Sequence, residues 1–326
     1  MIRRLFAVLA ACTLGAAVAP AVAGERTEWP VRPVRFIVPF PPGGTVDPLA
    51  RLLGTRLTAS LGQQFVVDNR SGGSGSIGTA IAAKAPPDGY TYLFVFDTHA
   101  VNPSLIPNLP FDTLKDLAPV MLVGTSPMAI ATAPGKPYRT FADVMKMAKA
   151  KPGAITYGSV GAGSLGHLTM TLVQDAGAIK LNHIPYKGGG PMSADMLGGH
   201  VELGIGSVAL LAPQVSAGKL RAVAVTGNKR SHAMPDVPAL AEQGFPGLSA
   251  LAWWGIFAPA GLPKATLDAF HAELVKTLNQ PDLRKQLTEQ LGMDLVVSDP
   301  PSLQKFTVSE LERWAKVVKQ YGIKAD

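Results

Sequence analysis

Short apolar runs alternate with longer amphipathic segments along most of the chain. The short runs are rich in β-branched and aromatic residues, whereas the longer segments repeat their apolar positions at helical spacing. Glycine, serine and proline gather at the joints between them. This alternation is typical of βαβ units, in which helices cover a sheet of parallel strands. The pattern therefore predicts an α/β protein.

The alternation forms two series, which are joined by two long crossings at 120–133 and 250–258. Strands are predicted at 34–40, 65–68, 92–96, 155–158, 182–186, 201–205 and 220–225. Helices are predicted at 48–61, 77–85, 141–150, 164–176, 191–197, 210–217, 264–278, 282–291 and 301–321. We expect two α/β domains with a cleft between them, the first formed by 24–124 plus 250–326 and the second by 125–249.

The first 23 residues have the pattern of a signal peptide. Arg3 and Arg4 precede an apolar stretch, 5–22, that carries no charge and ends in the small residues Ala21-Val22-Ala23. A membrane-spanning helix needs about 20 strongly apolar residues, and small-x-small is the pattern that signal peptidase cleaves. We expect cleavage after Ala23 and release into the periplasm. The arginine pair leaves both the general and the twin-arginine export routes open.

Composition narrows the chemistry of the exported part. Cys12, the only cysteine, lies in the predicted signal peptide, so no disulfide or thiol nucleophile is expected after cleavage. The formal charge is +7, of which Arg3 and Arg4 supply two, leaving +5. Basic residues are scattered singly and aromatic content is 7%, which does not fit a nucleic-acid surface. A mild positive charge suits small anionic ligands.

Several predicted helices follow joints rich in glycine, serine or proline. At such joints unpaired backbone amides and the helix dipole both favour an anion. The first joint is 40–48, in which Asp47 is expected to be the N-cap and Pro48 the first helical residue. The other joints are 71–76, 158–164, 186–191 and 206–207. One such joint alone is an ordinary tight turn, but several that meet at a cleft predict an anion site.

These joints also carry the motifs of a known family. The strings are Phe40-Pro-Pro-Gly-Gly-Thr-Val-Asp47, Asp68-Asn-Arg-Ser-Gly-Gly-Ser-Gly-Ser-Ile-Gly78, Tyr157-Gly-Ser-Val-Gly-Ala-Gly-Ser164 and His183-Ile-Pro-Tyr-Lys-Gly188. In this order they resemble the Bug family, the periplasmic receptors of tripartite tricarboxylate transporters, from about residue 30 onward. The resemblance implies a type II periplasmic binding protein fold that closes on a small organic carboxylate.

The resemblance also implies ligand contacts from both domains. From the first domain these are Phe40, Pro41, Gly44, Thr45, Asp47 and Thr98, and from the second Ser159, Gly163, Ser164, His167 and Ser207. Hydroxyl groups of Thr45, Ser159 and Ser164 would donate hydrogen bonds, and the backbone amides of Gly44 and Gly163 would do the same. Asp47 is expected to cap its helix, because a carboxylate repels an anionic ligand. Lys187 is either a counter-charge or a solvated loop cation.

Enzyme functions fit the sequence less well. Residues 161–166 match G-x-G-x-x-G, but the acidic residue that a dinucleotide site needs about 20 positions later is missing. Ser164 lies five residues beyond Ser159, too far from the strand for a nucleophile elbow, and His167 is too close in sequence to serve as its base. The six histidines show no metal-ligand spacing. We expect no catalytic residues, metal or cofactor, and an exported hydrolase is the less favoured reading.

The sequence leaves the ligand and the membrane partner open. The partner is either the permease of a tripartite tricarboxylate transporter or a sensor kinase of a signalling system. The motifs concern one carboxyl group, so they do not identify the rest of the acid. We expect a monomer that binds no nucleic acid.

Overall fold

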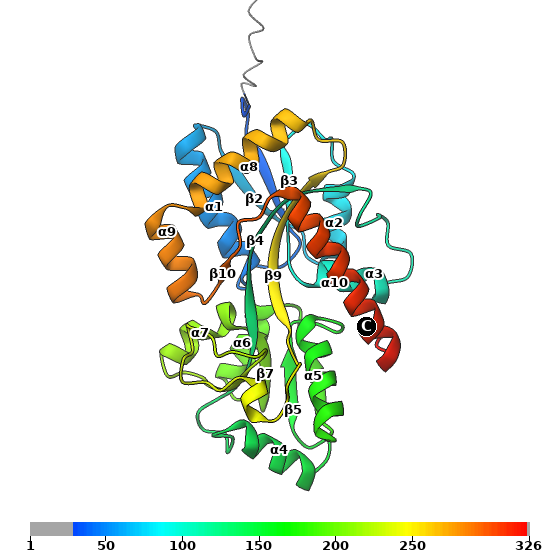
Figure 1. Cartoon of the computed structure of the whole chain (residues 1–326), viewed down its shortest axis with the longest axis vertical. Helices are drawn as coiled ribbons and strands as arrows, with labels where there is room; N and C mark the ends of the chain where they lie inside the picture. The colour runs from blue at the N-terminus through cyan, green and yellow to red at the C-terminus, as the bar shows by residue number, and fades with distance from the viewer. Residues whose placement is uncertain (1–28, 325–326) are drawn as a thin grey trace, which may run out of the picture.

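The computed structural model describes residues 29–324, which form two α/β lobes joined by two long strands (Figure 1). The predicted signal peptide, its cleavage point after Ala23 and Cys12 lie outside the described residues. The sheet order is β2-β1-β3-β9-β4-β7-β5-β6, with β8 and β10 also pairing with β4. The first lobe contains β1 to β3 and the second contains β5 to β8, so β4 and β9 lie between them.

In the first lobe β1 runs parallel to both β2 and β3. The strands are β1 (Val34–Val38), β2 (Phe65–Asn69) and β3 (Thr91–Val95). The helices are α1 (Val46–Leu61), α2 (Ser76–Ala83), α3 (Thr98–Leu105), α8 (Lys264–Leu278), α9 (Pro281–Lys285) and α10 (Pro300–Tyr321). Strand β1 is almost wholly buried, which is why it appears in the sequence as an apolar run.

In the second lobe β5 runs parallel to β6 and β7, while β7 and β8 pair antiparallel with β4. The strands are β5 (Thr156–Ser159), β6 (Asn182–Pro185), β7 (Leu203–Ser207) and β8 (Arg221–Val225). The helices are α4 (Phe141–Ala150), α5 (Leu165–Gly177), α6 (Gly189–Leu197) and α7 (Val208–Ser216). Each lobe thus repeats the predicted βα pattern.

Two antiparallel strands carry the chain between the lobes. Strand β4 (Leu117–Thr132) pairs with β9 (Leu251–Pro259) along most of the length of both, with register shifts at two places. The short β10 (Asp294–Leu295) adds to β4. The two crossings predicted at 120–133 and 250–258 are confirmed. The two lobes are thus joined through one shared pair of antiparallel strands.

Two local features differ from the prediction, and a third helix is irregular. Helix α1 begins at Val46, so Asp47 is its second residue and not its N-cap. Thr98 opens α3, a helix that the pattern did not predict. Asn102 and Pro103 disfavour a helix, yet α3 forms because buried residues such as Val101 pack in the core. The segment predicted as a helix at 282–291 is helical, but it changes from α9 to a π-helical turn at Gln286–Gln290.

Candidate functional site

A cavity of about 210 Å³ lies between the two lobes. The first lobe lines it with two segments, the turn that leads into α1 and the chain that follows α9. The second lobe lines it with α6 and α7. The lining residues are Gly43, Gly44, Thr45, Pro48, Leu49, Ser193, Ala209, Leu210, Gln214, Leu287, Leu291 and Met293. A concave space between two domains is the usual place for a small-molecule site.

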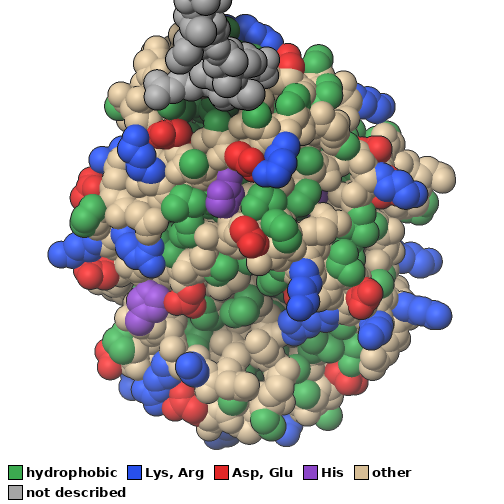
Figure 2. Space-filling view, turned by 45° about the horizontal axis from the view of Figure 1, so that its top comes forward, with side chains coloured by type: hydrophobic (Ala, Val, Ile, Leu, Met, Phe, Trp, Pro, Cys, Tyr) green, Lys and Arg blue, Asp and Glu red, His purple; other side chains and the backbone are tan. Residues whose placement is uncertain are grey.

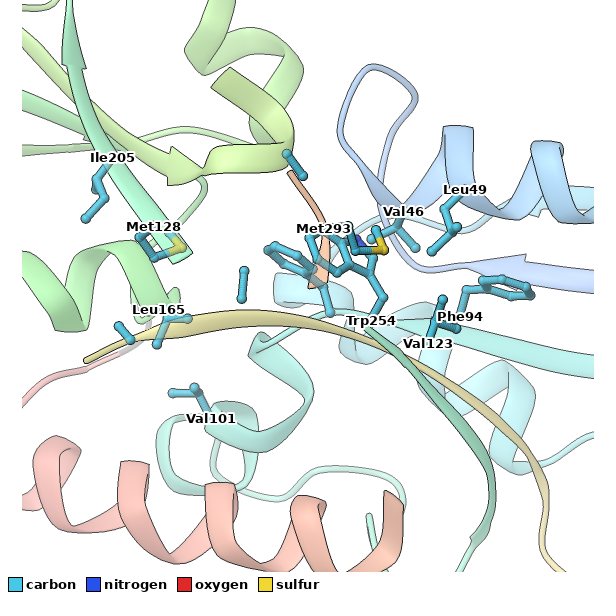
Figure 3. Packing of buried hydrophobic residues seen from close by; sticks show 14 of the residues in the cluster. Val46, Leu49, Phe94, Val101, Val123, Met128, Leu165, Ile205, Trp254 and Met293 are labelled. Carbon is cyan, nitrogen blue, oxygen red and sulfur yellow. The ribbon is translucent and has the colours of Figure 1, made fainter. Parts of the chain in front are cut away.

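The start of α1 faces this cavity without a side-chain cap. Thr45 occupies the N-cap position, but its hydroxyl makes no hydrogen bond to the helix. Instead Thr45 Oγ1 accepts a hydrogen bond of 3.1 Å from Nε1 of Trp254. Trp254 is buried and lies near Val46, the first residue of α1 (Figure 3). The first amides of a helix have no partner within the helix. An anion in the cavity can therefore use them.

Asp47, Asn69 and Phe40 brace this turn from behind. The Asp47 carboxylate accepts hydrogen bonds from Arg51 Nε at 3.0 Å and from Asn69 Nδ2 at 2.9 Å. Asn69 Nδ2 also donates to the carbonyl oxygen of Phe40 at 3.1 Å. These bonds tie the turn to the end of β2. The negative charge of Asp47 is thus paired within the first lobe, and neither Asp47 nor Phe40 lines the cavity.

In the second lobe three predicted polar groups bond to one another. Ser159 Oγ donates to the carbonyl oxygen of Gly161 at 2.8 Å and accepts from Ser164 Oγ at 3.2 Å. Its third contact is His183 Nε2, at 2.7 Å. Because a carbonyl only accepts, Ser159 uses its proton there, and this network assigns the His183 proton to Nε2. Ser164 also caps α5 by accepting from the amide of His167.

The imidazole of His183 lies between two other rings. It stacks on His167 with ring centroids 3.9 Å apart and on Tyr157 at 4.9 Å. Burial, with a smaller contribution from His167, lowers the pKa of His183 to about 4. The ring is therefore neutral at pH 7. His167 Nδ1 accepts from the amide of Gly163 at 3.0 Å. His183 was not among the predicted contacts, although it opens the quoted motif 183–188.

The remaining predicted residues are placed as follows. Ser207 is buried and caps α7 by accepting from the amide of Leu210 at 3.2 Å. Thr98 is buried at the start of α3, and Lys187 is exposed in its loop. Of the eleven predicted contacts only Gly44 and Thr45 line the cavity. The apolar lining from Leu287 to Met293 carries no motif, so sequence reasoning missed it.

The lobes touch at several places, and two of these involve predicted contact residues. At one of them a Cβ atom on Gly43 would meet Gly190 Cα at 3.4 Å, and one on Gly188 would meet Pro41 Cγ at 3.4 Å. At the other, a Cβ atom on Gly163 would overlap the side chain of Leu105 in α3. Glycine at these positions allows two backbones to approach closely. The two lobes are thus in direct contact in this structure.

A buried carboxyl group lies close to the start of α5. Asp97 precedes α3 and is 1% exposed, and neither carboxyl oxygen makes a hydrogen bond of good geometry within the described chain. Burial raises its pKa to about 8, and the charge of Glu310 adds to this rise. The backbone amides of Leu165 and Thr98 favour the charged carboxylate and partly offset this rise in pKa. The charged form of Asp97 is therefore disfavoured at neutral pH.

Charge on the outer surface is mixed. On the face shown in Figure 2, lysine and arginine side chains are interspersed with aspartate and glutamate and form no continuous basic patch. Among residues 29–324 no group of three His, Cys, Asp or Glu side chains could hold a metal ion. No helix in this range is long and apolar enough to cross a membrane.

Two α/β lobes that close over an interdomain cavity define a binding protein of the periplasmic type. Residues 49–323 match the family described as "Tripartite tricarboxylate transporter family receptor", and the chain belongs to this family. The resemblance seen in the sequence motifs and the predicted fold are both confirmed. Members are periplasmic solute-binding receptors.

Individual relatives are similar to this chain along nearly its whole length. Protein BugT of Bordetella pertussis is 36% identical over 98% of both chains. A solved structure described as R. palustris Rpa4515 with adipate is 33% identical, with a TM-score of 0.87, and covers 91% of this chain and 99% of that one. MatC of Rhodopseudomonas palustris with bound malate is 28% identical, with a TM-score of 0.82, over 89% of this chain and all of the other.

Proposed function

We propose that this protein captures a small organic carboxylate in the cavity between its lobes and delivers it to the permease of a tripartite tricarboxylate transporter. The observation that carries the proposal is the uncapped start of α1 at the cavity wall. Two relatives with adipate and with malate support an acidic ligand. The family description favours transport over signalling.

We place the carboxyl group against the turn formed by Gly44 and Thr45. Phe40, Pro41, Asp47 and Thr98 hold that turn and its surroundings in shape. Ser159, Gly163, Ser164, His167 and Ser207 form the polar part of the second lobe that closes toward it. Residues 24–124 plus 250–326 and residues 125–249 then rotate as two domains about β4 and β9. The mature monomer starts after Ala23.

Binding without catalysis fits the lining of the cavity. Within the described chain none of its lining side chains is an acid, a base or a histidine. General acid–base catalysis needs such a group within hydrogen-bond reach of the substrate. The hydroxyl and amide groups that are present can hold a carboxylate but cannot exchange protons with it at neutral pH.

A matched pair of variants at Gly44 tests this placement. A Cβ atom there meets nothing within 4 Å, and the residue is outside the left-handed region, so a side chain can be added without a clash. Gly44→Asp puts a negative charge beside the ligand, whereas Gly44→Asn has the same shape without the charge. We expect Gly44→Asp to weaken carboxylate binding at least about tenfold, or about 1.4 kcal/mol, relative to Gly44→Asn.

The measurement is a thermal-shift and calorimetric screen of mono-, di- and tricarboxylates, with alcohols and amines of the same carbon skeleton as controls. A ligand that binds only the folded state raises its stability, by about 2.7 kcal/mol at one hundred times Kd. The carboxylate proposal fails if no acid shifts the melting temperature. The placement fails if acids bind but both Gly44 variants bind them equally well.

A further inference from the structure

One segment of the first lobe both lines the cavity and touches the second lobe. This wall segment, residues 286–294, runs from the π-helical turn into β10. Three of its side chains line the cavity, namely Leu287, Leu291 and Met293. At Gly292 its backbone meets the second lobe, because a Cβ atom there would lie 2.6 Å from Ala233 Cβ and 2.7 Å from Val208 Cγ1. Contact between the lobes and the shape of the cavity therefore depend on the same segment.

His232 of the second lobe reaches both ends of the wall segment. It lies in the loop between β8 and β9, which is anchored in the second lobe because Met234 and Val237 pack in the core there. Its Nε2 atom is 2.8 Å from the carbonyl oxygen of Thr288. Its Nδ1 atom is 3.6 Å from Oδ1 of Asp294. One imidazole thus bridges the lobe boundary through two partners.

The two partners of His232 require different protonation states. A carbonyl oxygen only accepts, so the bond to Thr288 assigns a proton to Nε2. In a neutral imidazole Nδ1 then has no proton, and its lone pair faces the Asp294 carboxylate. In the imidazolium form both nitrogens donate, and the ring pairs with Asp294 as well. A histidine side chain changes its charge between about pH 5 and 8, so the second contact depends on pH in that range.

Other charges around His232 do not replace Asp294. The charged residues of 229–236 and of the wall segment are Lys229, Arg230, Asp236, Glu289 and Asp294. Arg230 pairs with Glu242, and Glu289 lies 3.9 Å from Lys285. Strand β4 and helix α7, which border Gly292, contain no charged residue. In the described chain Asp294 alone brings a carboxylate oxygen within 4.0 Å of the His232 ring.

We propose that His232 is a positioning residue for the cavity, and that its protonated form ties both ends of the wall segment to the second lobe. Protonation then favours the arrangement in which the lobes touch. This inference goes beyond the proposed function, because it holds for any ligand that the cavity takes. The two side chains are 47% and 57% exposed, and a pair so exposed is weak. We expect protonation to raise the ratio of touching to separated lobes about two- to fivefold, and less in high salt.

A distance between two spin labels, measured on the mature protein without ligand, tests the proposal. Residues 29–324 contain no cysteine, so labels can be placed on cysteines introduced by Ala59→Cys in α1 and Lys219→Cys after α7. Both positions are exposed, and they lie in different lobes. Between pH 8 and 5.5 the ratio of short to long distances should rise about two- to fivefold more in the parent than in His232→Gln. Glutamine can still donate to the Thr288 carbonyl but cannot become charged.

Two further variants complete the test. Asp294→Asn removes the charge that faces Nδ1, and it should lose the same pH response. His200→Gln is the matched control, since His200 Nδ1 is 3.3 Å from Asp195 Oδ1 but both residues belong to the second lobe; this variant should respond as the parent does. Any contribution from Asp97 is common to all four proteins. The proposal is overturned if the parent and His232→Gln respond equally, if Asp294→Asn keeps the full response, or if the parent shows one distance that does not change with pH.

Discussion

Helices α1 and α5 both start at a glycine-rich turn after a parallel strand, but their first turns differ in what they bond. At α5 the hydroxyl of Ser164 caps the helix, and the carboxyl group of Asp97 lies close to the Leu165 amide. At α1 the hydroxyl of Thr45 bonds to Trp254 and no side chain caps the helix. One helix start is thus capped by a side chain of the protein, and the other faces the cavity.

The difference shows that a glycine-rich turn does not by itself make an anion site. The dipole and the unpaired amides are common to both helices. What distinguishes them is whether a side chain already satisfies those amides. Here the Thr45 hydroxyl accepts from the indole of Trp254. The backbone of Thr45 is already helical (φ −98, ψ −22), whereas an N-cap residue that bonds to its helix is usually extended, and no side-chain cap is formed. The comparison is why the start of α1, and not that of α5, is the proposed position of the carboxylate.

The largest effect is expected from a side chain at Gly163. This residue has φ +69 in the left-handed region, and a Cβ atom there would overlap Leu105. Strain of this kind costs about 1–3 kcal/mol for a non-glycine residue, and the overlap adds to it. We expect Gly163→Ala to lower the unfolding free energy in urea by about 2–3 kcal/mol. It should also weaken ligand binding, because the overlap opposes lobe closure.

Gly44→Ala is the matched control, since its Cβ atom meets nothing within 4 Å. Its unfolding free energy should stay within about 0.5 kcal/mol of the parent value. Equal stability of the Gly163→Ala and Gly44→Ala proteins would show that contact between α5 and α3 does not constrain the lobes.

A pH effect of intermediate size is expected from Asp97. Its folded pKa of about 8 lies above its ordinary value, so the folded state holds a proton that the unfolded state has lost. Stability from this group is complete in acid and is lost as the pH rises toward 8. Burial lowers the pKa of His99 to about 3. This group therefore makes the protein less stable as the pH falls below about 6.5, which is the opposite dependence. The window from pH 6.5 to 8 therefore isolates Asp97.

Replacement of Asp97 by asparagine removes the titratable carboxyl group and keeps the shape of the side chain. In urea unfolding at pH 8, Asp97→Asn should be more stable than the parent by about 2 kcal/mol. Its stability should also change less between pH 6.5 and 8. A parent protein whose stability does not fall in this window would mean that the carboxyl group is charged and paired beside α5.

The fold was largely predictable from the sequence because buried parallel strands such as β1 appear as apolar runs between turn residues. The predicted strand and helix of 34–40 and 48–61 differ from the structure by two residues at one end. Helix α3 was not predicted, since its stability comes from tertiary packing and not from local propensity. Of the site, the turn at Gly44 and Thr45 could be predicted from its glycines and from the family resemblance.

The other half of the site could not be predicted from local signals. The apolar wall from Leu287 to Met293 lies more than two hundred residues from the α1 turn and belongs to an ordinary amphipathic pattern. Only the return of the chain after α9 brings the two together. Likewise, the sequence showed a serine at the start of α5 but not that its hydroxyl is already used by Ser159 and the helix.

The smallest effect is expected from Ser164, and it tests the comparison most directly. Ser164→Ala removes the α5 cap and one hydrogen bond to Ser159, which should cost about 1 kcal/mol of stability. Because the carboxylate is assigned to α1, carboxylate affinity should fall less than about threefold, or about 0.7 kcal/mol. The control is Thr45→Ser, a mild change at the α1 turn that keeps the hydroxyl acceptor for Trp254. If Ser164→Ala abolishes binding in calorimetry while its stability stays at the parent value, the hydroxyl serves the ligand and not the helix. The carboxylate would then belong at the start of α5, where an anion would have to displace the bond between the two serines.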